Sequence, residues 1–300
     1  ILPLSNNKSI STAIGIIIPI IDSVWMSFTD YKIANLTQGI PGKWNNFANY
    51  TRLWDSGKLQ SAAGITIFFV FVTVLLTFIV SMTLALILNT KIVGARFLRS
   101  IMMIPWVIPT VIAGLLWAWI YANPYGLLQY LVSIFSGGKI TGFGILNNQS
   151  TALWGIIIAA LWKQIPLMAL LLLSGMQSIL DDMLEAAKID GATKWQTLTR
   201  VTIPNIMPSI TICLFLTITN GFKLFDQNLA LTNGQPFEQL KDGSVIKTTE
   251  MLALNIYNTF YGQSLTGKGV AQAKAVIFFI LVAGISIIQL KATRSKEVQQ

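Results

Sequence analysis

The sequence predicts an all-α, polytopic membrane protein with about six transmembrane helices. Hydrophobic residues make up 53% of the 300 residues and charged residues only 11%, whereas a soluble domain carries roughly 25% charged residues. The mean hydropathy is +0.63, and six stretches are apolar over most of the roughly 20 residues that a helix needs to cross the hydrocarbon. Burying all of them in a soluble core would need a polar shell, which this composition does not supply.

Each apolar stretch is expected to form a helix, because unpaired backbone groups are not tolerated against lipid. Pro19 and Asp22 interrupt the first stretch, the second and third carry no charge, and the fourth holds only Lys163. The fifth is shorter and polar at both ends, and the sixth holds only Lys274, near its start. The stretches are residues 10–28, 62–88, 101–121, 152–173, 205–221 and 269–290.

The connecting segments indicate the orientation only weakly. If both termini lie on the side of the 89–100 and 174–204 loops, each side of the membrane holds ten lysines and arginines, with Lys163 between them. The 89–100 loop is short and carries three bases and no acid, and short loops count most in the positive-inside rule. We therefore expect cytoplasmic termini.

The residue inventory disfavours an enzyme and a nucleic-acid-binding protein. The chain has no histidine, which is the usual general base and the commonest metal ligand. Cys213 is the single cysteine, so no internal disulfide can form. The net charge is +9, but the bases form no clustered face of the kind that nucleic-acid binding needs. We expect them at the membrane edges, against anionic lipid.

The beginning of the chain is expected to be incomplete. Residues 1–9 contain neither a starting methionine nor a signal-peptide pattern. We therefore expect the natural protein to begin further upstream.

The segment after the fourth apolar stretch carries the most specific pattern. Asp182, followed three residues later by Glu185, is typical of a capping box that opens a helix. Asp190-Gly191 is expected to end this helix, since glycine adopts the left-handed conformation that helix ends favour. A second amphipathic helix is expected from about Thr193. Pro204 is expected to begin the next membrane helix, where its missing N–H costs little.

This segment resembles the EAA loop of ATP-binding-cassette import permeases. In that family the loop reads Glu-Ala-Ala, then after two or three residues Asp-Gly-Ala, and about ten residues later an aliphatic residue, any one residue, and Leu-Pro; Val201 has the place of that aliphatic residue here. Leu198 stands where an aromatic residue is common, and Ile203 where leucine is common. An ordinary amphipathic loop at the membrane surface is the alternative, but it would not need this order of residues. The matching residues here are Glu185, Ala186, Ala187, Asp190, Gly191, Ala192 and Pro204.

Other segments resemble the carbohydrate branch of that family, the maltose and glycerol-phosphate permease type. Residues 27–31 (Ser-Phe-Thr-Asp-Tyr) look like the exit of its first helix, and residues 105–109 (Pro-Trp-Val-Ile-Pro) are similar to its third helix. Residues 162–166 resemble its fourth helix, residues 231–236 (Leu-Thr-Asn-Gly-Gln-Pro) the element after its fifth, and residues 249–253 the approach to its sixth.

The resemblance implies a single permease domain over residues 1–300, with a cytoplasmic coupling loop at 174–204 that docks into an ATPase subunit. It implies a multi-pass protein of a bacterial plasma membrane. The partners would be a homologous second permease, two ATP-binding-cassette ATPases and an extracytoplasmic solute-binding protein. The cargo would be a sugar, an oligosaccharide or a polyol phosphate, moved by alternating access. The chain itself would be no enzyme and hold no cofactor, because the partner ATPases bind ATP and magnesium.

Polar residues in the fourth apolar stretch are candidates for the substrate path. An ionisable residue at mid-membrane such as Lys163 is costly and by default faces a polar pathway or a partner. Its neighbours Trp162 and Gln164 could stack on a sugar and hydrogen-bond to it. A lysine that instead reaches a backbone carbonyl or an acidic partner in the helix packing is an equally open alternative.

A second group of candidates lies in and after the fifth stretch. Thr217, Asn220 and Lys223 repeat at three-residue spacing, which places them on one face of a helix. With Phe225 and Asp226 they could line the substrate path. Ordinary hydrogen bonding between packed helices is the alternative.

Two other functions stay open on the sequence alone. The first is an importer of the same type for another solute, such as an amino acid or a peptide; the ligand of the binding protein would decide this. The second is an ion-coupled secondary transporter, a class that often shows internal repeats. We find no convincing repeat, and the coupling loop would then have no purpose.

Overall fold

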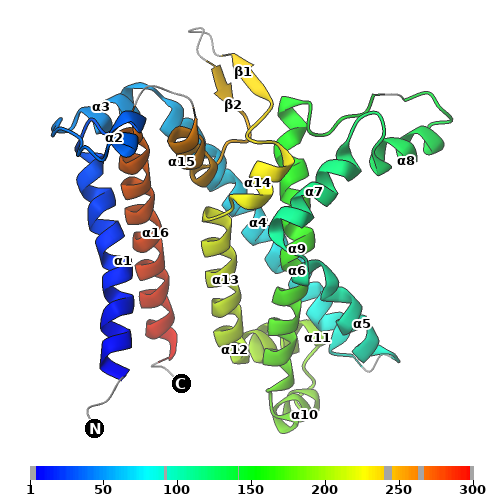
Figure 1. Ribbon diagram of the computed structural model, residues 1–300. Coiled ribbons are helices and arrows are strands. Elements are labelled where there is room, and N and C mark those ends of the chain that lie inside the picture. Colours follow the sequence, from blue (N-terminus) through cyan, green and yellow to red (C-terminus); the bar gives the residue numbers. More distant parts are fainter. Residues whose placement is uncertain (1–4, 91–92, 141, 240–244, 263–266, 298–300) are drawn as a thin grey trace. The chain divides into compact units, whose positions relative to one another are not determined.

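The computed structural model describes residues 5–90, 93–140, 142–239, 245–262 and 267–297 (Figure 1). By its internal contacts the chain forms two compact units. The terminal unit comprises Ile1–Gly64 and Leu252–Gly284, and the central unit comprises Ile65–Met251 and Ile285–Gln300. Residues 1–4, part of the predicted incomplete beginning, lie outside the described residues. One permease domain over the whole chain stays a prediction.

Helices dominate the described part of both units. The terminal unit holds α1 (Ser5–Ser27), α2 (Ile33–Gln38), α3 (Ala48–Asp55), the first turns of α4 (Lys58–Leu88), α15 (Leu252–Tyr261) and the larger part of α16 (Lys268–Glu297). The central unit continues with the rest of α4, α5 (Ala95–Met102), α6 (Ile104–Val107), α7 (Thr110–Tyr121), α8 (Leu127–Phe135) and α9 (Gln149–Gln177). It then adds α10 (Asp181–Ile189), α11 (Lys194–Thr197), a π-helical turn (Leu198–Thr202), α12 (Ile203–Asn205), α13 (Met207–Phe222) and α14 (Asp226–Leu231).

In the terminal unit, a side chain of α3 fixes the exit of α1. Asn49 Nδ2 donates to the carbonyl oxygens of Ser27 and Thr29, at 2.8 Å each. A Cβ at position 269 would lie 2.3 Å from the Thr29 oxygen, so glycine there lets α16 pass close to this turn. The buried apolar residues beside it are Leu53, Leu59, Ala62, Leu252 and Ala273.

The central unit is built on α4, α9 and α13, which cross one another closely. Lipid tails are as apolar as the side chains, so helices in a membrane associate largely through van der Waals packing, and small residues allow it. A Cβ at Gly175 on α9 would lie 2.4 Å from Ser209 Oγ on α13, and a Cβ at Gly221 would lie 3.1 Å from Val70 on α4. The buried core comprises Met82, Ala85, Leu88, Met168, Leu172, Leu173, Met176, Ile206, Ile210 and Cys213.

All six predicted stretches lie on helices. Within the described residues, α4, α9 and residues 268–289 of α16 are each long and apolar enough to cross a membrane, and Gly15–Ser27 of α1 forms a shorter apolar helix. Two bent pairs of helices raise the number of candidate spans to as many as five. Large apolar side chains such as Ile67, Phe71 and Leu75 of α4 are exposed, as expected for a face that contacts lipid.

The third stretch is not one helix, so the prediction of an unbroken span there was wrong. The pair Ala95–Val107 and Thr110–Tyr121 is bent by 93°. Pro109 has no N–H to donate, and Ile108 before it is extended, with ψ of 129°, because the proline ring disfavours the helical conformation for its predecessor. The apolar run therefore contains a break that composition does not reveal.

The fifth span begins later than predicted. Pro204 lies in α12, and Lys194–Asn205 meets Met207–Phe222 at an angle of 72°. Pro208 occupies the first turn of α13. It therefore takes the place at the start of the span that the sequence analysis assigned to Pro204.

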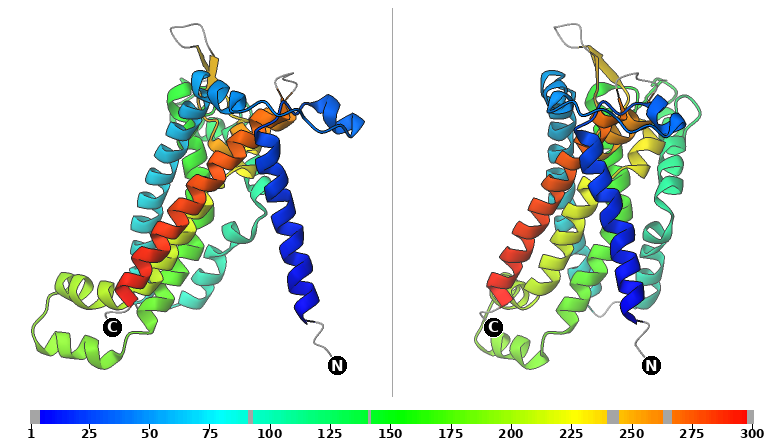
Figure 2. Two further views of the ribbon diagram at one scale, coloured as in Figure 1. Left: turned by 90° about the vertical axis from the view of Figure 1, so that its left-hand side faces the viewer. Right: turned by 60° about the vertical axis from the view of Figure 1, so that its left-hand side comes forward.

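A short hairpin lies at the opposite end of the central unit from α10 (Figures 1 and 2). β1 (Phe237–Gln239) and β2 (Val245–Lys247) pair antiparallel, with Phe237 opposite Lys247. Gln149 at the start of α9 donates from Nε2 to the Phe237 carbonyl at 2.7 Å. These strands were not predicted from the sequence.

Candidate functional site

The predicted coupling segment forms a helix, a tight turn and a second helix at one end of the central unit (Figure 1). The predicted capping box of Asp182 and Glu185 is wrong, because α10 begins two residues earlier, with Leu180 as its N-cap and no side-chain cap. Asp181 and Asp182 instead lie in the first turn and Lys188 in the last. These charges complement the helix dipole at both ends.

The turn after α10 is a Schellman motif that joins the two halves of the sequence signature. Gly191 is left-handed, with φ of +74°, as predicted. Its N–H donates to the Lys188 carbonyl at 3.1 Å, and the Ala192 N–H donates to the Ala187 carbonyl at 3.0 Å. A Cβ at Gly191 would meet nothing within 4 Å, so the backbone conformation, and not lack of space, favours glycine here.

The second helix starts at once with its own cap. Thr193 Oγ1 accepts from the Gln196 N–H at 3.3 Å, and the Thr193 N–H donates to Gln196 Oε1 at 2.8 Å. This reciprocal pair is a capping box. With a Schellman motif on one side and a capping box on the other, the turn at Gly191 and Ala192 has little freedom, and the segment is stiff.

The residues of the coupling segment differ in exposure. Glu185, Ala186 and Asp190 are exposed, whereas Ala187 is buried. Ile189 is 86% exposed and Trp195 is 71% exposed, although both are large and apolar. Neither residue was selected from the sequence; the signal was a large apolar residue on each side of Asp190-Gly191, Ile189 directly before it and Trp195 four residues after Gly191.

Lys163 binds the backbone at the break in the third span. Its Nζ donates to the Trp106 carbonyl at 3.2 Å and to the Ile108 carbonyl. These carbonyls lie where the helical hydrogen-bond ladder stops between α6 and α7. Of the two interpretations of Lys163, the one in which it contacts backbone carbonyls therefore describes its contacts in this structure.

The neighbours of Lys163 have different surroundings. The Trp162 ring packs edge-on against Trp117 of α7, with 5.8 Å between ring centroids. Gln164 Oε1 is buried with no hydrogen-bond partner. An unsatisfied buried acceptor is costly, and this oxygen is closed to solvent in the present conformation.

The candidates on and after α13 do not all lie together. Thr217 is buried and donates to the Cys213 carbonyl at 2.8 Å. Asn220, Lys223 and Asp226 are exposed, and Phe225 is the N-cap of α14. The three-residue spacing placed Thr217 with Asn220 and Lys223, but the packing of α13 on α4 and α9 separates Thr217 from them.

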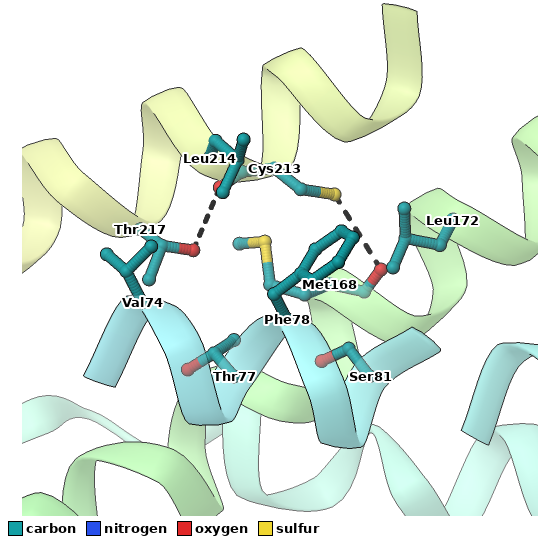
Figure 3. Close-up of a pocket in the computed structure, with 9 residues that line it drawn as sticks. All are labelled: Val74, Thr77, Phe78, Ser81, Met168, Leu172, Cys213, Leu214 and Thr217. Carbon is teal, nitrogen blue, oxygen red and sulfur yellow. Dashed lines mark hydrogen bonds between the residues drawn. The ribbon is translucent and has the colours of Figure 1, made fainter. Parts of the chain in front are cut away.

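A small cavity of ≈ 10 Å³ lies between α4, α9 and α13. A water needs roughly 10–15 Å³ of such space, whereas small-molecule sites measure roughly 300–1,000 Å³. The cavity is therefore no sugar site in this conformation. Among the described residues no group of three or more His, Cys, Asp or Glu could hold a metal. The residues that line the cavity include Thr77 and Ser81 of α4, Met168 and Leu172 of α9, and Cys213 and Thr217 of α13 (Figure 3).

The sequence matches a described protein family over residues 78–291, and the family is the "Binding-protein-dependent transport system inner membrane component". It is 34% identical over 290 residues to the "Probable starch degradation products transport system permease protein AmyD" of Thermoanaerobacterium thermosulfurigenes, covering 97% of this chain and 92% of the relative. It is 32% identical over 280 residues to the "Trehalose/maltose transport system permease protein MalF" of Thermococcus litoralis, covering 93% and 88%.

A solved structure has the same fold. It is a chain of the bacterial alginate ABC transporter in complex with alginate pentasaccharide-bound periplasmic protein, with a TM-score of 0.77 and 20% identity. The match covers 97% of this chain and 93% of that chain. At this identity the likeness concerns the fold alone.

Proposed function

Since the chain belongs to the family of binding-protein-dependent transport system inner membrane components, we propose that it is a sugar-conducting permease subunit of an importer driven by separate ATPases. It is an all-α, multi-pass protein of the inner membrane and a transport component, not an enzyme. The sugars named for its relatives support a carbohydrate cargo. Family membership sets aside an ion-coupled transporter that works alone.

The coupling segment is the observation that carries the proposal. It presents the acids Glu185 and Asp190 and the apolar side chains of Ile189 and Trp195 on a stiff helix–turn–helix. Exposed apolar residues of this size mark a protein-binding surface when they gather in one patch. The acids can pair with basic groups of an ATPase groove while Ile189 and Trp195 fill it.

The second helix of this segment can pass a displacement to a membrane span. It runs through the π-helical turn to Asn205 and meets α13 at the 72° bend. Ile206 at the bend is buried in the core of α4, α9 and α13. Closure of the ATPases on ATP would therefore move the N-terminal end of α13 and switch the permease between inward-open and outward-open states.

The partners follow from this division of labour. They are a homologous second permease, a pair of ATP-binding-cassette ATPases on the cytoplasmic side and an extracytoplasmic solute-binding protein. ATP and magnesium are bound by the ATPases, and this chain holds no cofactor. The coupling segment then faces the cytoplasm, and the β1–β2 end of the central unit faces outwards.

The substrate path is proposed from the polar side chains that the fold leaves available. Asn220, Lys223 and Asp226 are exposed, and the buried Gln164 Oε1 would need a conformational change to reach a sugar. Hydroxyl groups of a sugar both donate and accept, so amide and charged groups together can bind them. Trp162, Lys163, Thr217 and Phe225 stay candidates, with Lys163 and Thr217 also serving the packing.

The test is affinity purification of the full chain from its native membrane in mild detergent, with every co-purifying protein identified. The expected companions are a Walker-motif ATPase, a second multi-span permease and a soluble binding protein. If that binding protein binds a sugar, the result supports a sugar as the transported solute. If it binds an amino acid or a peptide, that compound is the transported solute instead. Recovery of the chain alone, with no ATPase even after cross-linking, would overturn the ATP-driven function.

A further inference from the structure

Helix α5 divides sharply into a basic and an apolar face. At 100° per residue, Arg96, Arg99 and Ser100 share one side, while Phe97 and Ile101 share the other with Leu98 and Met102. Phe97 is 68% exposed, and no residue of α5 is buried. The described chain therefore leaves Phe97, Leu98 and Ile101 exposed, while Met102 packs partly against the core of the central unit.

The direction of α5 follows from the break at Pro109. The pair of Ala95–Val107 with Thr110–Tyr121 is bent by 93°. The helical stretch that holds α5 therefore runs at a steep angle to α7, and the two do not form one straight span. The bonds from Lys163 to the Trp106 and Ile108 carbonyls hold this bend.

The depth of α5 is set by Arg99. Its Nη2 donates to the carbonyl of Leu88, the last residue of α4, at 3.2 Å. From Leu59 to Leu88 helix α4 carries no charge, so Leu88 lies at the level of one end of the apolar part of α4. Arg99 thereby holds α5 at this level, toward the same end of the central unit as α10 (Figures 1 and 2).

We propose that α5 is an interfacial anchor: its apolar face lies among lipid acyl chains, and Arg96 binds the phosphate of an anionic phospholipid. Arg96 is exposed, and no acid occurs between Val93 and Pro109. A basic face beside an apolar one is the arrangement of helices that lie in the plane of an anionic membrane surface. At the membrane surface, acyl chains can surround the apolar face of α5 while headgroups and water surround its basic face. A protein that covered Phe97 would bring apolar surface beside an unpaired Arg96. The proposal does not depend on the cargo or on the ATPases.

The position of α5 is tested with the full chain in nanodiscs, using a Cys213→Ala background and a single spin label. A label at Phe97→Cys is expected to be accessible to oxygen dissolved in the acyl region, and a label at Ser100→Cys to an aqueous nickel complex. If neither reagent reaches the Phe97 label, the face is covered by protein and the proposal is wrong.

The lipid contact is tested by titrating the detergent-solubilised full chain, labelled at Ser100→Cys with a fluorophore, with phosphatidylglycerol. Arg96→Glu is expected to weaken the response at least about fivefold, the typical share of one basic residue at an anionic surface. Lys188→Glu on exposed α10 makes the same change in net charge, and we expect it to leave the fluorescence response to phosphatidylglycerol unchanged. Equal weakening by both variants, or by neither, would refute the Arg96 site. Phosphatidylcholine, which carries no net charge, should give no response in any variant.

Discussion

From the sequence, Lys163 fits either a substrate path or a packing contact. Only its hydrogen-bond partners in the structure distinguish the two. A mid-membrane lysine is expected either in a polar pathway or in contact with a partner. In this structure its ammonium group binds the Trp106 and Ile108 carbonyls. Those acceptors exist because Pro109 breaks the helix, and the sequence analysis did not predict that break.

Replacement of Lys163 separates its structural role from a transport role. Lys163→Met keeps the length of the side chain and removes the donor, leaving two carbonyls unpaired. We expect a loss of about 1–3 kcal/mol in stability, measured as a lower Tm of the purified complex in detergent, with partial recovery in Lys163→Arg. An unchanged Tm combined with lost sugar uptake would place Lys163 in the substrate path instead.

At the scale of elements, local chemistry predicted the coupling segment well. Gly191 ends α10 in the left-handed conformation that its position before a second helix predicted. The start of α10 was predicted wrongly, because Asp and Glu are favourable anywhere in a first turn and do not by themselves locate the N-cap. The place of Pro204 was also wrong, since Pro208 is an equally good first-turn residue four positions later.

Disruption of the turn after α10 should separate ATP hydrolysis from transport. Glu185→Lys combined with Gly191→Pro reverses an exposed charge and removes the N–H and the left-handed backbone of the Schellman motif. In proteoliposomes with the partner subunits, we expect ATP hydrolysis to continue while uptake per ATP falls at least about tenfold, the factor given by 1.4 kcal/mol of lost coupling.

Helix α8 provides a matched control for that variant. It ends in the same motif: the Gly137 N–H donates to the Ile134 carbonyl at 3.1 Å, the Gly138 N–H donates to the Ser133 carbonyl at 2.8 Å, and φ of Gly137 is +61°. Gly137→Pro is expected to leave the ratio of uptake to hydrolysis unchanged. Normal uptake in the coupling variant would disprove the role of the segment.

At the scale of the whole molecule, the orientation in the membrane is the property that charge counting left undecided. We propose that α10 faces the cytoplasm and the α7–α8 connection faces outwards. In a Cys213→Ala background, and in vesicles that hold the chain without its ATPase partners, Ile189→Cys should react with a membrane-impermeant maleimide only in inside-out vesicles. Tyr125→Cys, at a position that is 90% exposed, should react only in right-side-out vesicles. Labelling of both positions from the same side would contradict this topology.

The membrane environment of this protein, most of its helical spans and the segment that marks its family could be predicted from the sequence. The hydrophobic content of a chain determines whether it can fold in water, and it is a property of composition alone. The turn at Gly191 depends on only a few neighbouring residues, so it too can be predicted from the sequence. The break at Pro109, the partners of Lys163 and the different burial of Thr217 and Asn220 became visible only in the folded chain. These depend on which helix faces meet, and in a uniformly apolar span neighbouring faces differ too little in sequence to show which one is buried.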